Sequence, residues 1–362
     1  MKRDQRTIVV FFLMLGALLA GTCFSSGKVF SEREKRYLAD KPEWSFSSLL
    51  SGAFMDDTDA WLADHVGGKE ELVFLKTMVE RLEGRTLLNG VYYKDGSYWQ
   101  HYEPDPRALE KTLAAWEAYA EAAAGVTDVY ILPVPLNSEI YPERLPAAAA
   151  EERQEETFAE VLRRMEGRAV VLDCRERLRA EKERYLYFRT DHHWTMEGAY
   201  LGAGAFLSAV GEGIAPREDF RREILNEGFY GTLYAKAPAL TAKPDELVHM
   251  FLPGVTCEVS LGGPSEARDG YLVREEREGR DPYSVFFGGN YGFLTIKNTS
   301  EGAYAGEGRL LVIKDSYANC LLPFLIPYYE EIDVIDPRHY MHSVAGRIAD
   351  GGYSAVLVIQ EV

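Results

Sequence analysis

Cysteine is scarce in this sequence, with four residues among 362. Cys23 lies in an apolar stretch near the N-terminus, which leaves Cys174, Cys257 and Cys320 at unrelated spacings. An odd number without a regular pattern excludes a disulfide scaffold, although one pair stays open. The C-x-x-C spacing of structural zinc sites is also absent.

Basic residues are outnumbered, because 40 Lys and Arg residues stand against 57 Asp and Glu residues, for a formal net charge of -17. Without a basic surface to replace the counterions of a phosphate backbone, nucleic acid is excluded as a partner. We interpret the excess acid as a solvated, self-repelling surface rather than a cation-binding site. Hydrophobic residues at 46% and charged residues at 27% are typical of a folded chain with a buried core.

Long apolar runs are rare as well, and the one that is long enough to span a membrane lies at the N-terminus. Residues 7–27 carry no charge, and residues 8–24 are almost wholly apolar. As a helix, these 21 uncharged residues would extend about 31 Å, enough to cross a hydrocarbon core. The sequence therefore predicts an N-terminal membrane anchor or signal segment at residues 1–27 and an extracytoplasmic domain at residues 28–362.

The orientation and fate of this segment depend on its flanks. Lys2, Arg3 and Arg6 favour a cytoplasmic N-terminus and an exported remainder. Basic residues at 28, 33, 35 and 36 weaken that charge signal, so the orientation also depends on the position at the extreme N-terminus. Residues 20–23, AGTC, match neither an A-x-A cleavage site nor a lipoprotein site, and we therefore favour an uncleaved anchor. The expected location is the cell membrane, with a single span; secretion after cleavage is the alternative.

Several short, nearly continuous apolar runs predict strands that are buried on both faces. They occupy residues 129–135, 169–172, 310–313, 332–335 and 355–359, and helix-like segments separate most of them. This pattern predicts an α/β fold with a doubly wound parallel sheet and helices on both faces. Between about 221 and 300 the sequence becomes Gly-rich, aromatic and alternating, which predicts a β-rich insertion.

Other elements are predicted before the first of these strands. Helical periodicity runs from Phe54 to Leu82, and residues 104–124 form a second amphipathic pattern. Between them, the segment NGVYYKDGSYW at residues 89–99 places aromatic and β-branched residues around Asn-Gly and Asp-Gly pairs. This arrangement predicts a β-hairpin.

One group of residues suited to acid–base chemistry is Asp191, His192 and His193, followed by Trp194 and a predicted helix over 196–210. In an extended segment, Asp191 and His193 point to one side and His192 points to the other. A carboxylate can then orient the imidazole and stabilise its cation during proton transfer. The structural alternative is a helix start that is capped by Thr or Asp and anchored by a buried Trp.

Metal binding is the competing functional interpretation of this motif, since Asp and His are both metal ligands. Adjacent histidines on an extended segment diverge, and no further cluster of ligands lies nearby in the sequence. The sequence therefore favours acid–base chemistry, and we expect neither a metal nor another cofactor.

A second group follows the apolar run at 310–313, in the segment LVIKDSYAN at residues 311–319. Ligands of open α/β sheets gather at the carboxyl ends of strands, so Ser316 lies where a nucleophile is expected. Its hydroxyl needs a base, and His193 is the best candidate in the chain. The apolar spacing over residues 321–325 resembles a helix, and the alternative role of Ser316 is therefore a helix cap.

Together these motifs resemble the DHHW protein family, relatives of the alginate O-acetylation proteins within the SGNH/GDSL hydrolase superfamily. The resemblance covers most of the exported chain, and it is carried by SEREKRYLADKPEW, PVPLNSEIYPERLP, TDHHWTMEGAY, FYGTLYAK, FFGGNYGFLTI and VIKDSYANCLLPFL. It implies an SGNH-like fold in which the Asp-x-His element precedes the serine. It also implies that Ser316 is the nucleophile, His193 the base and Asp191 the residue that orients the base.

Members of the superfamily also use a glycine and an asparagine to bind the oxyanion. Asn137 is the first candidate, because it lies beyond the carboxyl end of the predicted strand at 129–135. Asn319, and Gly289 and Asn290 in a Gly-Gly-Asn turn, are weaker candidates. The alternative is that each is a turn or cap residue.

The resemblance implies an extracytoplasmic, serine-dependent O-acetyltransferase that acts on a cell-surface or secreted polysaccharide. The implied partners are the polysaccharide acceptor and a multipass membrane O-acyltransferase on the donor side. One alternative is a carbohydrate acetylesterase with the same triad. The sequence cannot distinguish it from the acetyltransferase, because the two reactions differ only in the acceptor, which is water in one and a sugar in the other. Another is a non-catalytic polysaccharide-binding or assembly protein, against which the intact Asp191, His193 and Ser316 argue.

Overall fold

The computed structural model describes residues 3–25, 27, 29–31, 36–147, 149, 153–261, 267–279 and 281–362. These residues fall into two units, the first made of residues 1–89 and 234–241 and the second of residues 90–233 and 242–362. Lys28, Arg33 and Lys35, which bear on the orientation of the N-terminal segment, lie outside the described residues.

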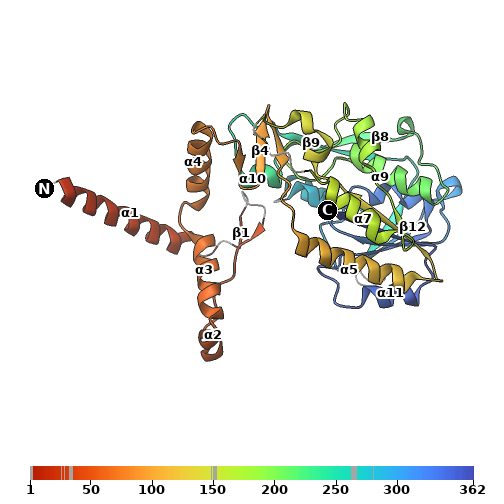
Figure 1. Ribbon diagram of the computed structural model, residues 1–362, viewed down its shortest axis with the longest axis horizontal. Helices are drawn as coiled ribbons and strands as arrows, with labels where there is room; N and C mark the ends of the chain where they lie inside the picture. Colours follow the sequence, from red (N-terminus) through yellow and green to blue (C-terminus); the bar gives the residue numbers. More distant parts are fainter. Residues whose placement is uncertain are drawn as a thin grey trace. The chain divides into compact units, whose positions relative to one another are not determined.

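The first unit is mainly helical. Its elements are α1 (Arg3–Ser25), β1 (Phe30–Ser31), β2 (Arg36–Tyr37), α2 (Phe46–Ser51), α3 (Ala53–His65), α4 (Lys69–Leu82) and β3 (Leu87–Leu88), labelled in part in Figure 1. In α1, the window Gln5–Thr22 is long and apolar enough to cross a membrane. A short helix, α10 (Thr232–Lys236), runs across the boundary between the two units.

The predicted helical run from Phe54 to Leu82 is interrupted, and α3 and α4 are separate helices. Gly68 has a φ of 74°, in the left-handed region that glycine adopts at little cost. A Cβ on Gly67 would lie 2.4 Å from the Cα of Gly21 in α1, so the chain approaches α1 too closely for any side chain there. The Gly67 N–H also donates to the Thr22 hydroxyl at 3.2 Å. The break therefore results from contacts that the helical periodicity does not contain.

An eight-stranded sheet forms the centre of the second unit, in the order β11-β10-β12-β14-β13-β15-β6-β7. The strands from β14 to β7 in this order are parallel, whereas β12, β10 and β11 pair antiparallel with their neighbours. The predicted apolar runs correspond to β6 (Asp128–Val134), β7 (Val170–Val171), β13 (Arg309–Lys314), β14 (Glu331–Ile335) and β15 (Ala355–Glu361). The predicted parallel sheet is therefore confirmed.

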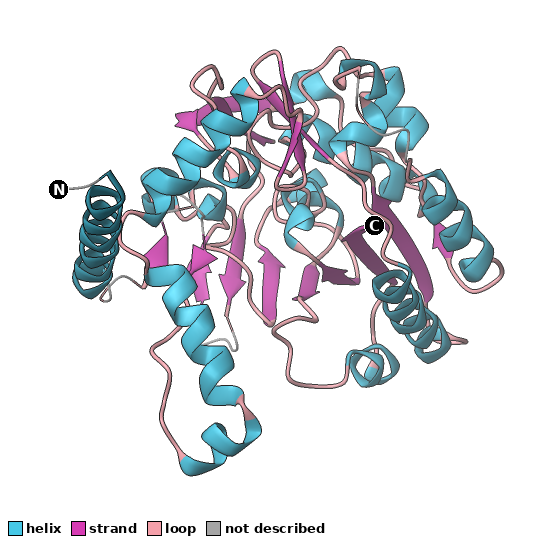
Figure 2. Cartoon of the chain, turned by 60° about the vertical axis from the view of Figure 1, so that its left-hand side comes forward, coloured by secondary structure: helices cyan, strands magenta, loops and turns pink. Residues whose placement is uncertain are grey.

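Helices cover both faces of this sheet, as predicted (Figure 2). Along β13, Leu310 and Val312 belong to a core cluster that includes residues of α8 (Arg175–Ala180) and α9 (Met196–Ala209). The alternate residues Leu311 and Ile313 belong to a second cluster with residues of α5 (Pro106–Ala123), α7 (Glu155–Met165) and α11 (Val344–Asp350). Both faces of the strand are buried, which explains why its sequence is continuously apolar.

The β-rich segment contributes to two sheets. Strands β8 (Arg221–Phe229) and β9 (Asp245–Phe251) form an antiparallel pair of their own. Strands β10 (Cys257–Ser260), β11 (Ala267–Asp269) and β12 (Phe293–Asn298) extend the central sheet at its antiparallel end. That this segment is an insertion into a simpler fold remains a prediction.

The predicted hairpin is formed by β4 (Val91–Lys94) and β5 (Ser97–Gln100), which pair antiparallel. Asp95 and Gly96 connect them with φ values of 54° and 85°. Two consecutive residues with positive φ form the tight turn that matches the twist of the strands, as the Asp-Gly pair indicated.

Short helices fill most of the remaining connections. They are α6 (Asn137–Ile140) and the 3₁₀ turns Pro142–Arg144, Arg217–Asp219, Arg274–Glu278, η5 (Pro282–Val285), Gly302–Tyr304, η7 (Ser316–Ala318), η8 (Leu322–Phe324) and η9 (Ile326–Tyr328). The helix that the spacing over 321–325 suggested is absent, because η7, η8 and η9 replace it. Pro323 and Pro327 lack the N–H that a continuous helix would require at those positions.

Candidate active site

Ser316 lies at the carboxyl end of β13, at the first position of η7. Asp315 begins this turn, because its carboxylate accepts a hydrogen bond from the Tyr317 N–H at 2.9 Å. The other carboxylate oxygen accepts from the Glu361 N–H at 2.8 Å, which ties the turn to the end of the neighbouring strand β15. Ser316 itself is partly exposed.

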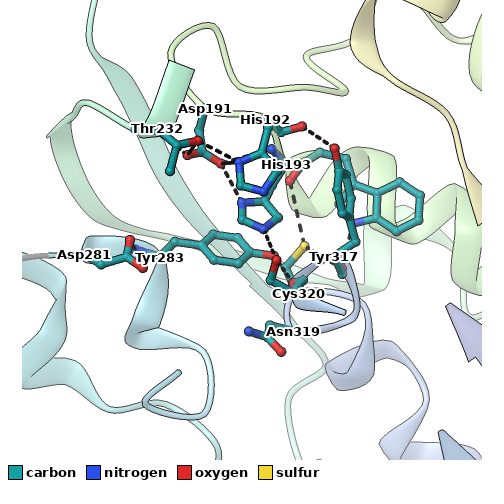
Figure 3. A network of polar contacts seen from close by, with 12 residues as sticks. Asp191, His192, His193, Thr232, Asp281, Tyr283, Tyr317, Asn319 and Cys320 are labelled. Atoms are coloured by element: carbon teal, nitrogen blue, oxygen red, sulfur yellow. Dashed lines mark hydrogen bonds and ion pairs between the residues drawn. The ribbon is translucent and has the colours of Figure 1, made fainter. Parts of the chain in front are cut away.

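The side chains of Ser316, His193 and Asp191 form a continuous chain of hydrogen bonds. Figure 3 shows Asp191 and His193 within this group. Ser316 Oγ lies 2.7 Å from His193 Nε2, and His193 Nδ1 lies 2.5 Å from Asp191 Oδ1. An ionised carboxylate only accepts, so Nδ1 carries the proton and Nε2 is left as the acceptor for the serine hydroxyl. The structure thus brings together the three residues singled out in the sequence, in the order that a nucleophile, a base and its orienting carboxylate require.

Asp191 is held from several directions although it is buried, with 2% of its surface exposed. Its Oδ1 also accepts from the His193 N–H at 3.0 Å, and its Oδ2 accepts from the Thr232 N–H at 2.8 Å. Burial alone would raise the pKa of Asp191, but the neighbouring imidazoles of His192 and His193 and the hydrogen bonds hold its pKa well below the ordinary range. Asp191 is therefore ionised throughout the neutral range.

His192 does not point away from this group, contrary to the expectation for an extended segment. Its ring centroid lies 3.8 Å from that of His193, and its Nδ1 lies 2.7 Å from the Thr232 hydroxyl (Figure 3). The backbone bends between Arg189 and His193 instead of running extended, so the alternation of a strand does not apply. The Thr232 hydroxyl can donate its own hydrogen to Asp191 at 3.0 Å. The hydrogen bond between His192 and Thr232 can then use a proton on His192 Nδ1.

Two neighbours position the catalytic candidates, although no sequence motif marked the first of them. The Tyr283 ring, from η5, stacks on His193 at 4.0 Å and an interplanar angle of 10°. Its hydroxyl donates to the Ser316 carbonyl at 3.0 Å. The Trp194 indole donates to the Tyr317 carbonyl at 2.9 Å, which joins the histidine segment to the serine turn. The predicted buried Trp is thus present, with no measurable exposed surface.

Cys320 lies one turn after Ser316 and is 1% exposed. Burial raises the pKa of its thiol to about 12, so the thiolate required of a nucleophile is not formed at neutral pH. Ser316 is therefore the better candidate for a nucleophile in this turn.

The candidates for oxyanion binding lie at two different positions in the structure. Asn137 is fully buried, accepts from the Gln100 N–H at 2.9 Å and donates to the Tyr98 carbonyl at 3.0 Å, so it joins α6 to β5. Asn319 and Asn290 contact each other, with the Asn319 amide donating to Asn290 Oδ1 at 3.2 Å. Gly289, with a φ of 115°, precedes Asn290 in its turn. An oxyanion role for any of them remains a prediction.

Asp191, His192 and His193 also form the group of possible metal ligands found in the described part of the chain, with one ligand atom from each within 4.8 Å of the others. Asp191 already accepts hydrogen bonds at both oxygens, and His192 Nδ1 is bonded to Thr232. A metal ion bound through these atoms would compete with these contacts. The arrangement fits a hydrogen-bonded proton relay better than a metal site.

Two cavities lie beside the carboxyl ends of β13 and β15. One, of about 430 Å³, is lined by Lys314, Asp315 and Arg338 among others. The other, of about 460 Å³, includes Glu361, whose carboxylate lies 2.6 Å from the Tyr317 hydroxyl. Ser316 lines neither of these two cavities.

Comparison with known proteins gives a family and a fold. The model of the DHHW protein family matches residues 85–335. None of the curated proteins matches the chain. The structure of a DHHW family protein from Eubacterium siraeum is 25% identical, with a TM-score of 0.64, over 76% of this chain and 91% of that one.

Two structures of Bacillus cereus PatB1, one of them with a sulfonyl adduct, have TM-scores of 0.60. They are 18% and 19% identical over 75% of this chain, and the matches cover 94% and 95% of theirs. These similarities confirm the SGNH-like α/β fold that the sequence resemblance implied.

Proposed function

The chain belongs to the DHHW protein family, and from this premise we propose that it is an extracytoplasmic, serine-dependent O-acetyltransferase that acts on a cell-surface or secreted polysaccharide. The observation that carries the proposal is the chain of hydrogen bonds from Ser316 through His193 to Asp191. Supporting it, Asp191 is ionised and buried, and Ser316 is the partly exposed end of the chain.

In the first half of the reaction, Ser316 Oγ attacks the acyl carbon of a donor while His193 Nε2 takes the hydroxyl proton. The bond between the acyl carbon and the donor breaks, and the leaving group departs with that proton. Asp191 stabilises the imidazolium that exists between these steps. The product of this half-reaction is an acyl ester on Ser316.

In the second half, a sugar hydroxyl attacks the ester carbon and His193 takes its proton. The bond to Ser316 Oγ breaks, the proton returns to the serine, and the sugar carries the acyl group. The Ser316 N–H makes no hydrogen bond in the described part of the chain, so it is free to donate to the oxyanion in both halves. With water in place of the sugar, the same steps give a carbohydrate acetylesterase.

The proposal includes a membrane setting and a donor-side partner. α1 holds the chain at the membrane with the larger unit outside the cytoplasm. A multipass membrane O-acyltransferase would supply the acyl group. These parts derive from the family resemblance and from the apolar N-terminal segment, and they are tested separately from the triad.

The test is acetate release from a chromogenic acetyl ester by the full chain in detergent. Ser316→Ala and His193→Ala should each lower kcat/KM by at least about 1,000-fold, and the double variant should be scarcely worse because triad members act as one unit. Asp191→Asn should also lose roughly 10⁴-fold, because an amide no longer holds the useful tautomer. A sulfonyl fluoride should modify Ser316 and no other serine.

Matched controls are Ser208→Ala and His339→Ala, which change exposed residues outside the site and should keep full activity. Retention of activity in Ser316→Ala would refute the proposed nucleophile. A second assay with an acetylated donor and an oligosaccharide acceptor distinguishes transfer to a sugar from hydrolysis by water. An acetylated oligosaccharide in the mass spectrum indicates transfer, and free acetate alone indicates hydrolysis.

A further inference from the structure

Lys314 is a buried cation two residues before Ser316. It is the last residue of β13, and 4% of its surface is exposed. Its Nζ donates to Asn319 Oδ1 at 2.8 Å and to Asn290 Oδ1 at 2.5 Å. Asp336 Oδ2 is farther away, at 3.9 Å. Lys314 thus connects two motifs that are separate in the sequence, FFGGN and KDSYAN.

The ammonium group fixes the orientation of both amides. Because a lysine ammonium has donors only, each asparagine must present its oxygen to Lys314 and turn its NH₂ group elsewhere. One hydrogen of the Asn319 NH₂ group donates to Asn290 Oδ1 at 3.2 Å. The second hydrogen has no acceptor in the described part of the chain, although Asn319 is 2% exposed.

This spare donor is attached to the serine turn. The Asn319 backbone N–H donates to the Ser316 carbonyl at 3.1 Å, within the same turn. A buried amide hydrogen without an acceptor is unusual in a folded protein and invites a functional explanation. An oxyanion formed at Ser316 is a suitable acceptor, because it appears only during the reaction.

We propose that Lys314 is a positioning residue, whose ammonium group locks the Asn319 amide with its spare N–H available to the oxyanion formed at Ser316. This inference rests on the proposed function. Asp336 does not require Lys314 as a counterion, because Arg338 already binds both of its oxygens, at 2.9 and 2.6 Å. The lysine therefore has its closest contacts with the two amides rather than with an acid.

Charges around Lys314 give the proposal a pH dependence. Burial is the largest influence and lowers the pKa of Lys314; Asp336 and Asp315 oppose the shift, Arg338 adds to it, and the resulting pKa is about 8. Asn290 and Asn319 carry no charge, and Lys111 lines the same cavity from α5. Above about pH 8 the neutral amine can accept a hydrogen bond, so the amides are free to flip and kcat should fall.

Stability should change in the opposite direction. The pKa of Lys314 in the folded chain, about 8, lies below the ordinary value of 10.5. Between these values the unfolded chain binds more protons, so the free energy of unfolding should rise with pH in that window. If Lys314 had only a structural role, kcat would not fall over the pH range in which the free energy of unfolding rises.

The test uses the full chain, the chromogenic ester, and the variants Lys314→Met and Asn319→Ala alone and together. Each single variant should lower kcat about 100- to 1,000-fold with little change in KM, as expected for the loss of one oxyanion contact. The double variant should be no slower than Asn319→Ala, because Lys314 acts through Asn319. Lys297→Met, at an exposed position on β12, is the matched control and should leave kcat unchanged.

The dependence of kcat on pH is a second measurement. It does not use Lys314→Met, so it applies even if that variant fails to fold. The unmodified chain should lose activity above about pH 8, and Asn319→Ala, which keeps the lysine, should lack this alkaline limb. Full kcat in Lys314→Met, multiplicative losses in the double variant, or an unchanged limb in Asn319→Ala would each overturn the inference. Activity that survives in Ser316→Ala would instead refute the proposed function, so the two failures are distinguishable.

Discussion

The carboxylate of Asp191 is confined by a glycine as well as by hydrogen bonds. A Cβ on Gly231 would lie 2.3 Å from both the Cβ and the Oδ2 of Asp191, far inside van der Waals contact. Gly231→Ala should therefore displace the carboxylate from His193. We expect kcat for the acetyl ester to fall about 100-fold, the scale on which small displacements of catalytic groups act.

The matched control is Gly228→Ala, because the nearest atom to a Cβ there is 3.8 Å away. Steady-state kinetics on both variants, with circular dichroism to verify folding, would check the prediction. Equal activity in the two variants would show that the position of Asp191 does not limit the reaction.

At the residue scale, local motifs singled out Ser316, His193 and Asp191, and the structure places their side chains in one chain of hydrogen bonds. Ser316 and His193 stood out because a serine followed a buried strand and an Asp-x-His motif preceded a helix. Tyr283 and Lys314 could not be found in this way, because no local motif reveals the contact of Tyr283 with the distant His193 or the burial of Lys314. His192 was placed wrongly, because the local bend is set by tertiary contacts such as that with Thr232.

Among the elements, β5 and α6 are joined by one buried side chain. Asn137 binds the Gln100 N–H and the Tyr98 carbonyl, and both backbone groups would lose these partners in Asn137→Ala. Unpaired buried polar groups cost about 1–3 kcal/mol each, so we expect the free energy of unfolding in urea to fall by roughly 2–4 kcal/mol. kcat should remain within about threefold of the wild-type value if Asn137 has only this structural role.

Asn226→Ala is a suitable comparison, because Asn226 lies in β8 and its amide bonds the Arg277 carbonyl near the surface. Its effect on stability should be smaller. A loss of about 100-fold in kcat for Asn137→Ala at nearly unchanged stability would favour the alternative, in which Asn137 donates to the oxyanion.

Element types were predicted well where burial alone decides them. The five apolar runs became strands, and residues 104–124 became α5 with Asp105 as its N-cap. The helix after Ser316 was predicted from apolar spacing, but Pro323 and Pro327 break it into 3₁₀ turns. Those prolines were visible in the sequence and should have outweighed the periodicity. By contrast, the break between α3 and α4 depends on the contact of Gly67 with Gly21.

At the scale of the whole molecule, strand order is the feature that the sequence reveals least. Strand β15, at the end of the chain, lies between β13 and β6, and β12 pairs with β14. Alternating or continuous apolar patterns show which faces are buried but not which strands are neighbours. The placement of Ser316 beside the end of β15 follows from this order.

The N-terminal helix α1 predicts that the whole molecule is attached to a membrane. In α1, Phe11, Phe12 and Leu13 are 54%, 63% and 69% exposed, so these apolar side chains are not part of a core. Burying such side chains in a hydrocarbon core is favourable by about 25 cal/mol per Å² of apolar surface. We therefore expect the full chain to sediment with membranes and to resist extraction by alkaline carbonate.

A chain that begins near Ser31 should remain in the soluble fraction and stay folded, because every described strand of the central sheet begins at Asp128 or later. N-terminal sequencing of the membrane-bound form decides between the two fates of the segment. An intact N-terminus supports the anchor, whereas a mature N-terminus between residues 23 and 30 would show a cleaved signal and a secreted protein. Digestion of intact cells with an external protease should remove the second unit if it lies outside, because the membrane would then protect only the N-terminal segment.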